Sequence, residues 1–248
     1  ETANTLKYFY INPGSWATGG DLNTARRNMA GAGIQTSALS IGGGDPTVAT
    51  EKYNGTSWTE VNDLNTARSY LAGAGATNTA ALAFGGYVGP PGATAVTELW
   101  NGTNWTEVND LGTARYRLAG AGIQTAALAF GGQPPPSSTA LTETWNGTNW
   151  TEVNDLNTAR KQLAGAGTNT AALAFGGTIA FPSLSALTEL WNGTNWTEVN
   201  DLNTARSYLA GCGTQTAALA FGGTPTPTLY AATEEWNAGP TTATITTD

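Results

Sequence analysis

The sequence predicts an all-β fold, a five-bladed β-propeller whose blades are four-stranded antiparallel sheets. One stretch, Trp100 to Gly132, returns almost unchanged from Tyr53, Trp145 and Trp191, with partial copies at both termini. Repeats of forty-odd residues that contain several short strands are typical of propeller blades. The spacings of 42, 47, 45 and 46 residues separate five aligned tryptophans, which are Trp16, Trp58, Trp105, Trp150 and Trp196.

The number of units is five, because a glycine pair occurs once in each copy. These pairs are Gly42-Gly43, Gly85-Gly86, Gly131-Gly132, Gly176-Gly177 and Gly222-Gly223. No linker separates the copies, so the 248 residues are predicted to form one domain, 1–248. Its repeats lie near 16–57, 58–104, 105–149, 150–195 and 196–240.

Each unit is predicted to contain four strands, which we name a, b, c and d in chain order. In the second unit these are Leu71–Ala76, Ala80–Phe84, Ala95–Trp100 and Trp105–Val108. Asn78 marks the turn between strands a and b, and Asn101-Gly102 is a hairpin signal between c and d, because it supplies the positive φ angles of a tight turn. No window shows the 3.6-residue apolar stripe of a helix.

Strand a is predicted to lie innermost, because its small residues suit the narrow channel of a ring with few blades. In the second unit these residues are Gly73, Ala74 and Gly75. The ring is expected to close by pairing N-terminal with C-terminal strands in one blade, since closure removes sheet edges. Tyr8–Gly20 contains a strand d with Trp16, and a second candidate outer strand is Thr242–Thr246. The sequence leaves open which of the two closes the ring.

Composition excludes several partner classes. The net charge is −8 and the pI is about 4.5, so neither nucleic acid nor an anionic membrane surface is an expected partner. No run approaches 18 apolar residues, so membrane insertion is not expected. The single cysteine, Cys212, stands where other units have alanine, and we interpret it as a packing residue.

The absence of histidine argues against catalysis. With His at 0, the chain lacks the commonest general base and the commonest transition-metal ligand. We therefore predict no catalytic residues, no metal site and no cofactor. A hydrolase with a pair of carboxylates is the remaining enzymatic alternative, and only Asp45 and Glu235 break the five-fold equivalence of the acidic residues.

A repeated loop, Asp-Leu-Asn/Gly-Thr-Ala-Arg, joins strand d of one unit to strand a of the next. Its aspartate and arginine, five residues apart, can form a charge-assisted pair, and we interpret the loop as a structural brace rather than a repeated metal or anion site. The glutamates of strand c are predicted to meet an arginine or backbone amides between blades. The loop pairs are Asp21/Arg26, Asp63/Arg68, Asp110/Arg115, Asp155/Arg160 and Asp201/Arg206.

The repeat resembles the kelch repeat, and the resemblance covers almost the whole chain. It rests on the glycine pair after strand b, the strand d tryptophan, the arginine that opens the next unit, and a Glu-x-Trp or Glu-x-Tyr motif in strand c. These motifs are Glu51/Tyr53, Glu98/Trp100, Glu143/Trp145, Glu189/Trp191 and Glu234/Trp236. The resemblance implies a β-propeller. Some kelch-like propellers are copper oxidases, but their chemistry needs histidine ligands, which this chain lacks.

Positions that differ between the repeats identify a candidate binding face. They are the two residues after the loop arginine and the loop that follows the glycine pair. In an antiparallel meander these two connections lie at the same end of the blade, so the diverged residues should gather on one face. Tyrosine, arginine, lysine and glutamine beside proline-stiffened loops are suited to binding. The candidate ligand-binding residues are Arg27, Asn28, Tyr70, Tyr87, Tyr116, Arg117, Lys161, Gln162 and Tyr208.

We therefore expect a non-catalytic binding module. The near-identical units resemble the recently amplified propeller repeats of bacteriophage and bacterial surface proteins. This resemblance implies an extracellular or virion-surface location, with a surface glycan or protein, or neighbouring virion or fibre subunits, as partner. Two alternatives stay open: a multivalent lectin with one sugar site per blade, which would use the repeated tryptophans, and a purely structural or decorating virion protein without a ligand. Irregular ends and varied loops argue against a designed consensus repeat.

Overall fold

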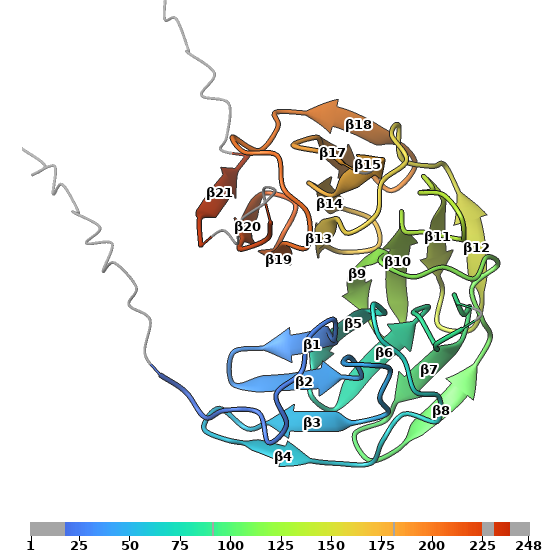
Figure 1. Ribbon diagram of the computed structural model, residues 1–248, viewed down its shortest axis with the longest axis vertical. Coiled ribbons are helices and arrows are strands. Elements are labelled where there is room, and N and C mark those ends of the chain that lie inside the picture. The colour runs from blue at the N-terminus through green and yellow to red at the C-terminus, as the bar shows by residue number, and fades with distance from the viewer. Residues whose placement is uncertain (1–17, 91, 181, 225–230, 239–248) are drawn as a thin grey trace, which may run out of the picture.

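The computed structural model describes residues 18–90, 92–180, 182–224 and 231–238. These residues form an all-β, five-bladed propeller, as predicted, and none of them is helical (Figure 1). Blades 1 to 4 are four-stranded antiparallel meanders, and blade 5 has three described strands. None of the described segments is a helix long and apolar enough to span a membrane.

The strands follow one another in the order a, b, c, d within each blade. Blade 1 contains β1 (Ala30–Ile34), β2 (Ser37–Ile41), β3 (Thr50–Tyr53) and β4 (Trp58–Glu60). Blade 2 contains β5 (Ala72–Thr77), β6 (Ala80–Phe84), β7 (Thr97–Trp100) and β8 (Trp105–Val108). Blade 3 contains β9 (Ala119–Ile123), β10 (Ala126–Phe130), β11 (Thr142–Trp145) and β12 (Trp150–Val153).

Blade 4 is interrupted by a small ribbon between its second and third strands. It contains β13 (Ala164–Gly167), β14 (Ala172–Phe175), β17 (Thr188–Trp191) and β18 (Trp196–Val199), and the ribbon pairs β15 (Thr178–Ala180) with β16 (Ser183–Leu184). Blade 5 contains β19 (Ala210–Gly213), β20 (Ala217–Phe221) and β21 (Thr233–Asn237). In blade 2, β6 and β8 have the predicted bounds, whereas β5 is shifted by one residue and β7 begins two residues later than predicted.

The predicted hairpin between strands c and d is confirmed. In blade 2 the Asn101 side-chain oxygen accepts hydrogen bonds from the backbone N–H groups of Thr103 and Asn104, at 3.0 and 2.9 Å. Gly102, with φ of 95°, adopts the left-handed conformation that favours glycine. This turn sets the register in which Trp100 pairs with Trp105 across β7 and β8.

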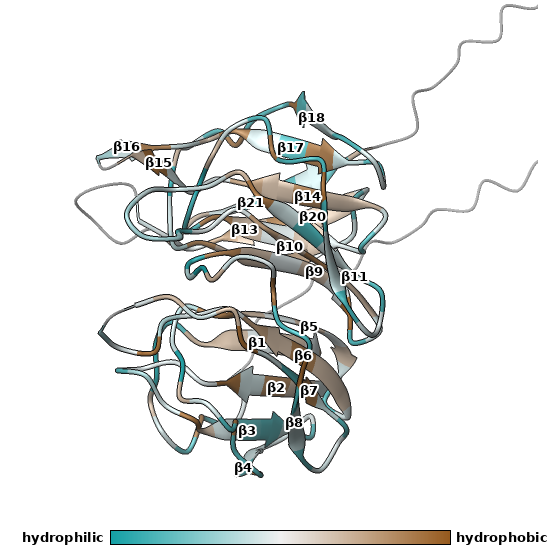
Figure 2. Cartoon of the chain, turned by 90° about the vertical axis from the view of Figure 1, so that its right-hand side faces the viewer, coloured by the Kyte–Doolittle hydropathy of each residue, from teal (hydrophilic) through white to brown (hydrophobic). Residues whose placement is uncertain are grey.

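The a strands of neighbouring blades pack side by side around the axis (Figure 1). A Cβ atom added to Gly120 of β9 would lie 2.7 Å from the ring of Phe84 in the neighbouring blade and 3.1 Å from the Gly73 carbonyl oxygen. Larger side chains would therefore force the blades apart. Figure 2 shows the hydrophobic colouring on inner strands such as β9 and β10 and hydrophilic colouring on β3, farther from the axis.

The tryptophan of strand d joins each of blades 2, 3 and 4 to the preceding blade. Trp150 of β12 lies 4.8 Å from Phe84 of β6, measured between ring centroids, and its indole N–H donates to the Thr97 hydroxyl at 3.0 Å. Trp196 makes the equivalent contact with Phe130 at 5.0 Å. Trp105 is 5% exposed and donates to the Thr50 hydroxyl at 3.1 Å. These residues therefore belong to the hydrophobic core between blades, as their repetition indicates.

The loop arginines form the expected structural brace, but each pairs with a strand c glutamate and not with the aspartate of its own loop. Arg68 pairs with Glu98 of strand β7 at 2.9 Å, and both side chains are 0% exposed. Asp63 instead accepts a hydrogen bond from the Thr50 backbone N–H of the preceding blade, at 3.2 Å. The expected aspartate–arginine pair is thus corrected to an arginine–glutamate pair. The five pairs are Arg26/Glu51, Arg68/Glu98, Arg115/Glu143, Arg160/Glu189 and Arg206/Glu234.

The second carboxylate oxygen of the same glutamate accepts hydrogen bonds from the loop. The sequence predicts that the strand c glutamates meet an arginine or backbone amides, and Glu98 meets both. Glu98 accepts the Asn65 backbone and side-chain N–H groups at 2.7 and 2.8 Å. Burial lowers the pKa of the Arg68 guanidinium, and the charge of Glu98 opposes this shift. The pair is therefore both a charge neutraliser and a clamp that fixes the loop leading from blade 1 into blade 2.

The predicted ring closure falls largely outside the described residues. This applies to the strand d with Trp16 and to the candidate strand Thr242–Thr246. Blades 1 and 5 form the two ends of the arc in Figure 1. At the blade 5 end, Phe221 is 37% exposed, whereas the equivalent residues of blades 2 and 3, Phe84 and Phe130, are 0% exposed.

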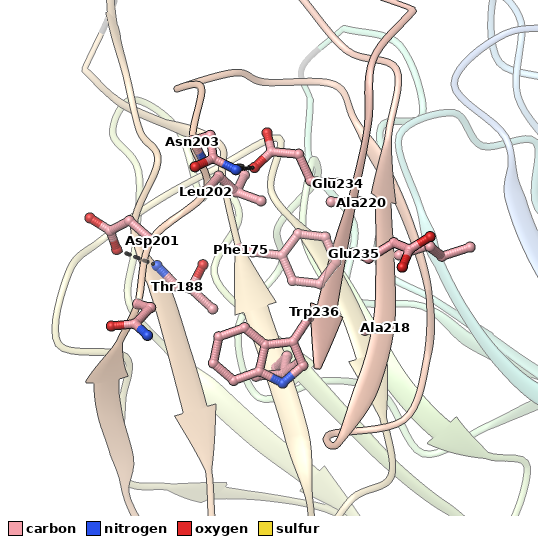
Figure 3. Close-up of a pocket in the computed structure, with 13 residues that line it drawn as sticks. Phe175, Thr188, Asp201, Leu202, Asn203, Ala218, Ala220, Glu234, Glu235 and Trp236 are labelled. Atoms are coloured by element: carbon pink, nitrogen blue, oxygen red, sulfur yellow. Dashed lines mark hydrogen bonds between the residues drawn. The ribbon is translucent and has the colours of Figure 1, made fainter. Parts of the chain in front are cut away.

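A groove of about 80 Å³ lies between blades 4 and 5, next to the outer edge of β21. Figure 3 shows Phe175 and Trp236 facing this groove, with Thr188 beside them. The equivalent phenylalanine and threonine of blade 3, Phe130 and Thr142, hold Trp196 of the next blade. The groove is therefore the blade 5 counterpart of a tryptophan position in the core, and we do not interpret it as a ligand site.

Candidate ligand-binding site

The two diverged segments of each unit meet on one face of the propeller, as the meander topology predicts. Ser69, which follows the loop arginine, exchanges two backbone hydrogen bonds with Tyr87, which follows the glycine pair, at 2.9 and 2.7 Å. Backbone bridges at the same place join Tyr116 to Gln133 and Lys161 to Thr178. A further bridge joins Ser207 to Thr224; the loop from 225 to 230 lies outside the described residues.

The second residue after each loop arginine has a left-handed backbone. The φ angles lie between 53° and 59°, in a region that residues other than glycine seldom adopt. This conformation recurs once per blade, while the side chain differs between most of the blades. The five residues, which we call the axial residues, are Asn28, Tyr70, Arg117, Gln162 and Tyr208.

Backbone hydrogen bonds link the axial residues from blade to blade. The Tyr70 N–H donates to the Asn28 carbonyl at 2.8 Å, and the Arg117 N–H donates to the Tyr70 carbonyl at the same distance. Gln162 and Tyr208 continue the series at 2.8 and 3.0 Å. The left-handed conformation thus turns each N–H and carbonyl toward neighbouring blades around the axis.

The axial residues surround a cavity of about 420 Å³ at the centre of the diverged face. The rest of the lining is apolar and comes from the residues at or just before the start of strand a in each blade. These residues are Met29, Leu71, Leu118, Leu163, Leu209 and Ala210. The cavity lining contains no aspartate or glutamate among the described residues. We call this space the axial cavity.

Aromatic rings cluster beside the axial cavity. The Tyr70 ring centroid lies 6.2 Å from that of Tyr116 and 6.5 Å from that of Tyr208, and Tyr87 lies 5.5 Å from Tyr116. The guanidinium carbon of Arg117 lies 4.9 Å from the Tyr70 centroid and 5.1 Å from the Tyr116 centroid. Such cation–π contacts restrict the orientation of the Arg117 side chain.

The side chains of Arg117 and Lys161 donate hydrogen bonds to the same glutamine, Gln133. Gln133, which is 8% exposed, accepts hydrogen bonds at its side-chain oxygen from Arg117 Nη1 at 3.2 Å and from Lys161 Nζ at 3.1 Å. Burial lowers the pKa of the Lys161 ammonium, and the Arg117 charge lowers it further. Burial also raises the pKa of the Tyr208 phenol above its ordinary value.

The structure divides the nine predicted ligand-binding residues into three groups. The five axial residues line the cavity. Outside the lining, Tyr116 contacts Tyr70 and Arg117, Tyr87 contacts Tyr116, and Lys161 bonds the same Gln133 oxygen as Arg117. Arg27 is not part of the lining; its side chain is 77% exposed and lies 3.5 Å from Asp45. Gln133 also belongs to the site but was not among the predicted residues. It lies in the loop after the glycine pair, which differs between the repeats, but nothing in the sequence singles out this residue within the loop.

The candidate carboxylates of the hydrolase alternative do not meet in this cavity. Asp45 is exposed beside Arg27, and Glu235 lies on β21 at the groove between blades 4 and 5. Across the described ranges, no group of three or more His, Cys, Asp or Glu side chains is placed to hold a metal ion.

No protein-family model matches the chain, and no curated protein is significantly similar to it in sequence. The propeller fold is therefore shown by the structure itself, and the likeness to kelch repeats is a resemblance of sequence motifs.

Proposed function

We propose that this protein is a non-catalytic binding module that recognises a surface glycan or protein through the axial cavity. The observation that carries this proposal is the left-handed backbone at the five axial residues. This conformation costs roughly 1 to 3 kcal/mol for a residue other than glycine, and asparagine tolerates it best. Neutral drift at such positions would favour glycine or asparagine. Only Asn28 conforms, and two of the five residues are tyrosines.

The side chains at the cavity suit binding. Tyr70, Tyr116 and Tyr208 offer rigid amphipathic area with little rotamer freedom to lose, and Gln162 and Arg117 add hydrogen-bonding groups. The backbone series between blades holds these side chains in place before a ligand arrives, which lowers the entropy cost of binding. The resemblance to kelch-like amplified repeats of bacteriophage and bacterial surface proteins supports a location on a virion or cell surface.

Burial of most of the repeated tryptophans weighs against the lectin alternative, with one sugar site per blade. Trp100, Trp145 and Trp191 are at most 1% exposed, and Trp105 and Trp196 are 5% exposed, so a sugar could not stack on these five rings without the blades separating. Trp58 and Trp150 are partly buried. The axial cavity favours one site per chain, because five different side chains share a single opening.

The test is binding of the full chain to a glycan array, with the stoichiometry of any hit measured by calorimetry. The triple variant Tyr70→Ala, Tyr116→Ala, Tyr208→Ala should weaken binding at least tenfold and remain folded by circular dichroism. Arg27→Ala, which changes an exposed residue outside the lining, is the control and should bind normally. Four or five equivalent sites would favour the lectin, and unchanged binding of the triple variant would reject the axial cavity.

A second variant tests the strain argument without relying on a known ligand. Tyr208→Asn introduces the residue that blade 1 has at this position, and Tyr208 is 47% exposed, so little packing is lost. We expect the melting temperature to stay the same or rise, because asparagine fits the left-handed conformation better. A clear decrease in melting temperature would show that Tyr208 is retained for stability.

A further inference from the structure

Most of the described positive charges of this acidic chain pair with a carboxylate of the protein. The sequence contains ten lysines and arginines, of which Lys7 lies outside the described residues. Six arginines form ion pairs: five with the strand c glutamates, and Arg27 with Asp45. In the described part of the chain, Lys52, Arg117 and Lys161 form no ion pair with a carboxylate. Of these, Arg117 and Lys161 share one acceptor, the side-chain oxygen of Gln133.

These two cations are held near each other although they repel. Both donate to the same oxygen of Gln133, which is a neutral acceptor and cancels neither charge. Two like charges in a partly buried place, without a counter-charge, destabilise each other. An anion in the cavity would relieve this repulsion, so the arrangement favours a negatively charged ligand.

Arg117 has donors available for such a ligand. Among the described residues its Nη1 has one acceptor, Gln133, and no acceptor bonds its Nη2. The terminal nitrogens of the five arginines paired with strand c glutamates, by contrast, bond a carboxylate and backbone carbonyls; for Arg68 these are Glu98, Gly85 and Val96. The Arg117 guanidinium, fixed between two tyrosine rings, can present a planar pair of donors to a carboxylate or sulfate.

The other side chains of the site are suited to a saccharide. Tyr70 and Tyr208 line the cavity, Tyr116 packs against Tyr70, and Tyr208 is 47% exposed. Tyrosine combines an apolar ring with a hydroxyl group, which matches the apolar face and the hydroxyl groups of a sugar. The lining offers no carboxylate that would repel an anion. The net charge of −8 disfavours non-specific attraction of anions, so binding would require this local arrangement.

We propose that the axial cavity binds an acidic saccharide, with Arg117 and Lys161 contacting its carboxylate or sulfate group and the tyrosines contacting its sugar ring. This inference rests on the proposed function, because it assigns a ligand class to the same cavity. Carboxylated and sulfated saccharides both offer an anionic group with several oxygen acceptors, and the experiment below distinguishes between them.

The probes are hexasaccharides of equal length: one that contains glucuronate, one that carries sulfate, and neutral maltohexaose. Calorimetry with the full chain should show binding of an acidic probe at least tenfold tighter than of maltohexaose, and weaker as salt is raised. Arg117→Gln should reduce this binding about tenfold or more, because it removes a charge-assisted hydrogen bond. Lys161→Gln removes a partly exposed charge, so it gives a second reading if Arg117→Gln impairs folding. Arg27→Gln is the charge-matched control and should bind as the unmodified chain does.

The outcomes separate the two proposals. If neutral glycans bind as well as acidic ones, or Arg117→Gln and Lys161→Gln change nothing, the acidic-saccharide inference is wrong, whereas loss of binding in the triple tyrosine variant would still support the axial cavity. Binding of an acidic peptide but of no saccharide would overturn the ligand class. Acidic binding that survives both the tyrosine and the Arg117 variants would overturn both proposals. Failure of every acidic probe to bind would overturn the inference.

Discussion

Replacing Trp105 by alanine tests how the blades are held together. Trp105 is 5% exposed and lies in one core cluster with Ile41 and Leu64 of the blade 1 side and Ala83 of its own blade. A buried tryptophan removes roughly 150 to 250 Å² from water, worth about 4 to 6 kcal/mol at about 25 cal/mol per Å². Alanine retains a small part of this burial, and the core relaxes partly. We therefore expect Trp105→Ala to lower the free energy of unfolding by about 3 to 5 kcal/mol.

The indole N–H accounts for a smaller share of this loss. It donates to the Thr50 hydroxyl at 3.1 Å, and a neutral hydrogen bond of this kind contributes about 1 kcal/mol. Trp105→Phe should therefore cost less than Trp105→Ala, because most of the ring contact remains. The difference between the two variants separates packing from hydrogen bonding.

The assay is equilibrium unfolding in urea, followed by far-ultraviolet circular dichroism. Fluorescence is less suitable, because the chain has 9 tryptophans. The slope of the free energy with denaturant should stay unchanged, so that the midpoint reports stability. A loss below 1 kcal/mol for Trp105→Ala would refute the reasoning, because it would mean that the blades do not depend on this contact.

Two further predictions concern the brace and the ring closure. Glu98→Gln should destabilise the protein by about 3 to 5 kcal/mol in the same assay, because it leaves the buried Arg68 guanidinium without a counter-charge; a neutral effect would show that the pair is dispensable. The groove at Phe175 and Thr188 is the counterpart of a tryptophan position, and Trp16, which aligns with the strand d tryptophans, belongs to one of the two candidate closing strands. Trp16→Ala should therefore lower the melting temperature, and an unchanged value would contradict closure through this residue.

The strands and their order could be predicted from the repeated pattern. Each unit alternates short apolar runs with strong turn signals. The hairpin forms at Asn101-Gly102 as predicted, although only Gly102 takes a positive φ angle and Asn101 stabilises the turn through its side-chain oxygen. These features depend on contacts between residues a few positions apart. The gathering of the diverged residues on one face followed from the meander order alone, and the bridge between Ser69 and Tyr87 confirms it.

The pairing of the loop arginines could not be predicted with the right partner. Asp63 is five residues from Arg68 and of opposite charge, yet the guanidinium bonds Glu98, which is 30 residues away. Local spacing made the aspartate a possible partner, but the hairpin of β5 and β6 and the return of β7 bring the glutamate closer. The brace was therefore expected, while its geometry depended on how the blade folds back.

The sequence by itself determined the number of blades, the strands and the face on which variation gathers, because repetition, apolar alternation and turn chemistry are local properties of the chain. Tertiary structure alone decided that Asn28, Tyr70, Arg117, Gln162 and Tyr208 surround one cavity and that Gln133 joins Arg117 to Lys161. These residues come from different blades and meet only because each a strand turns inward at the same axis. Their left-handed backbone, too, follows from hydrogen bonds between neighbouring blades, which no local pattern encodes.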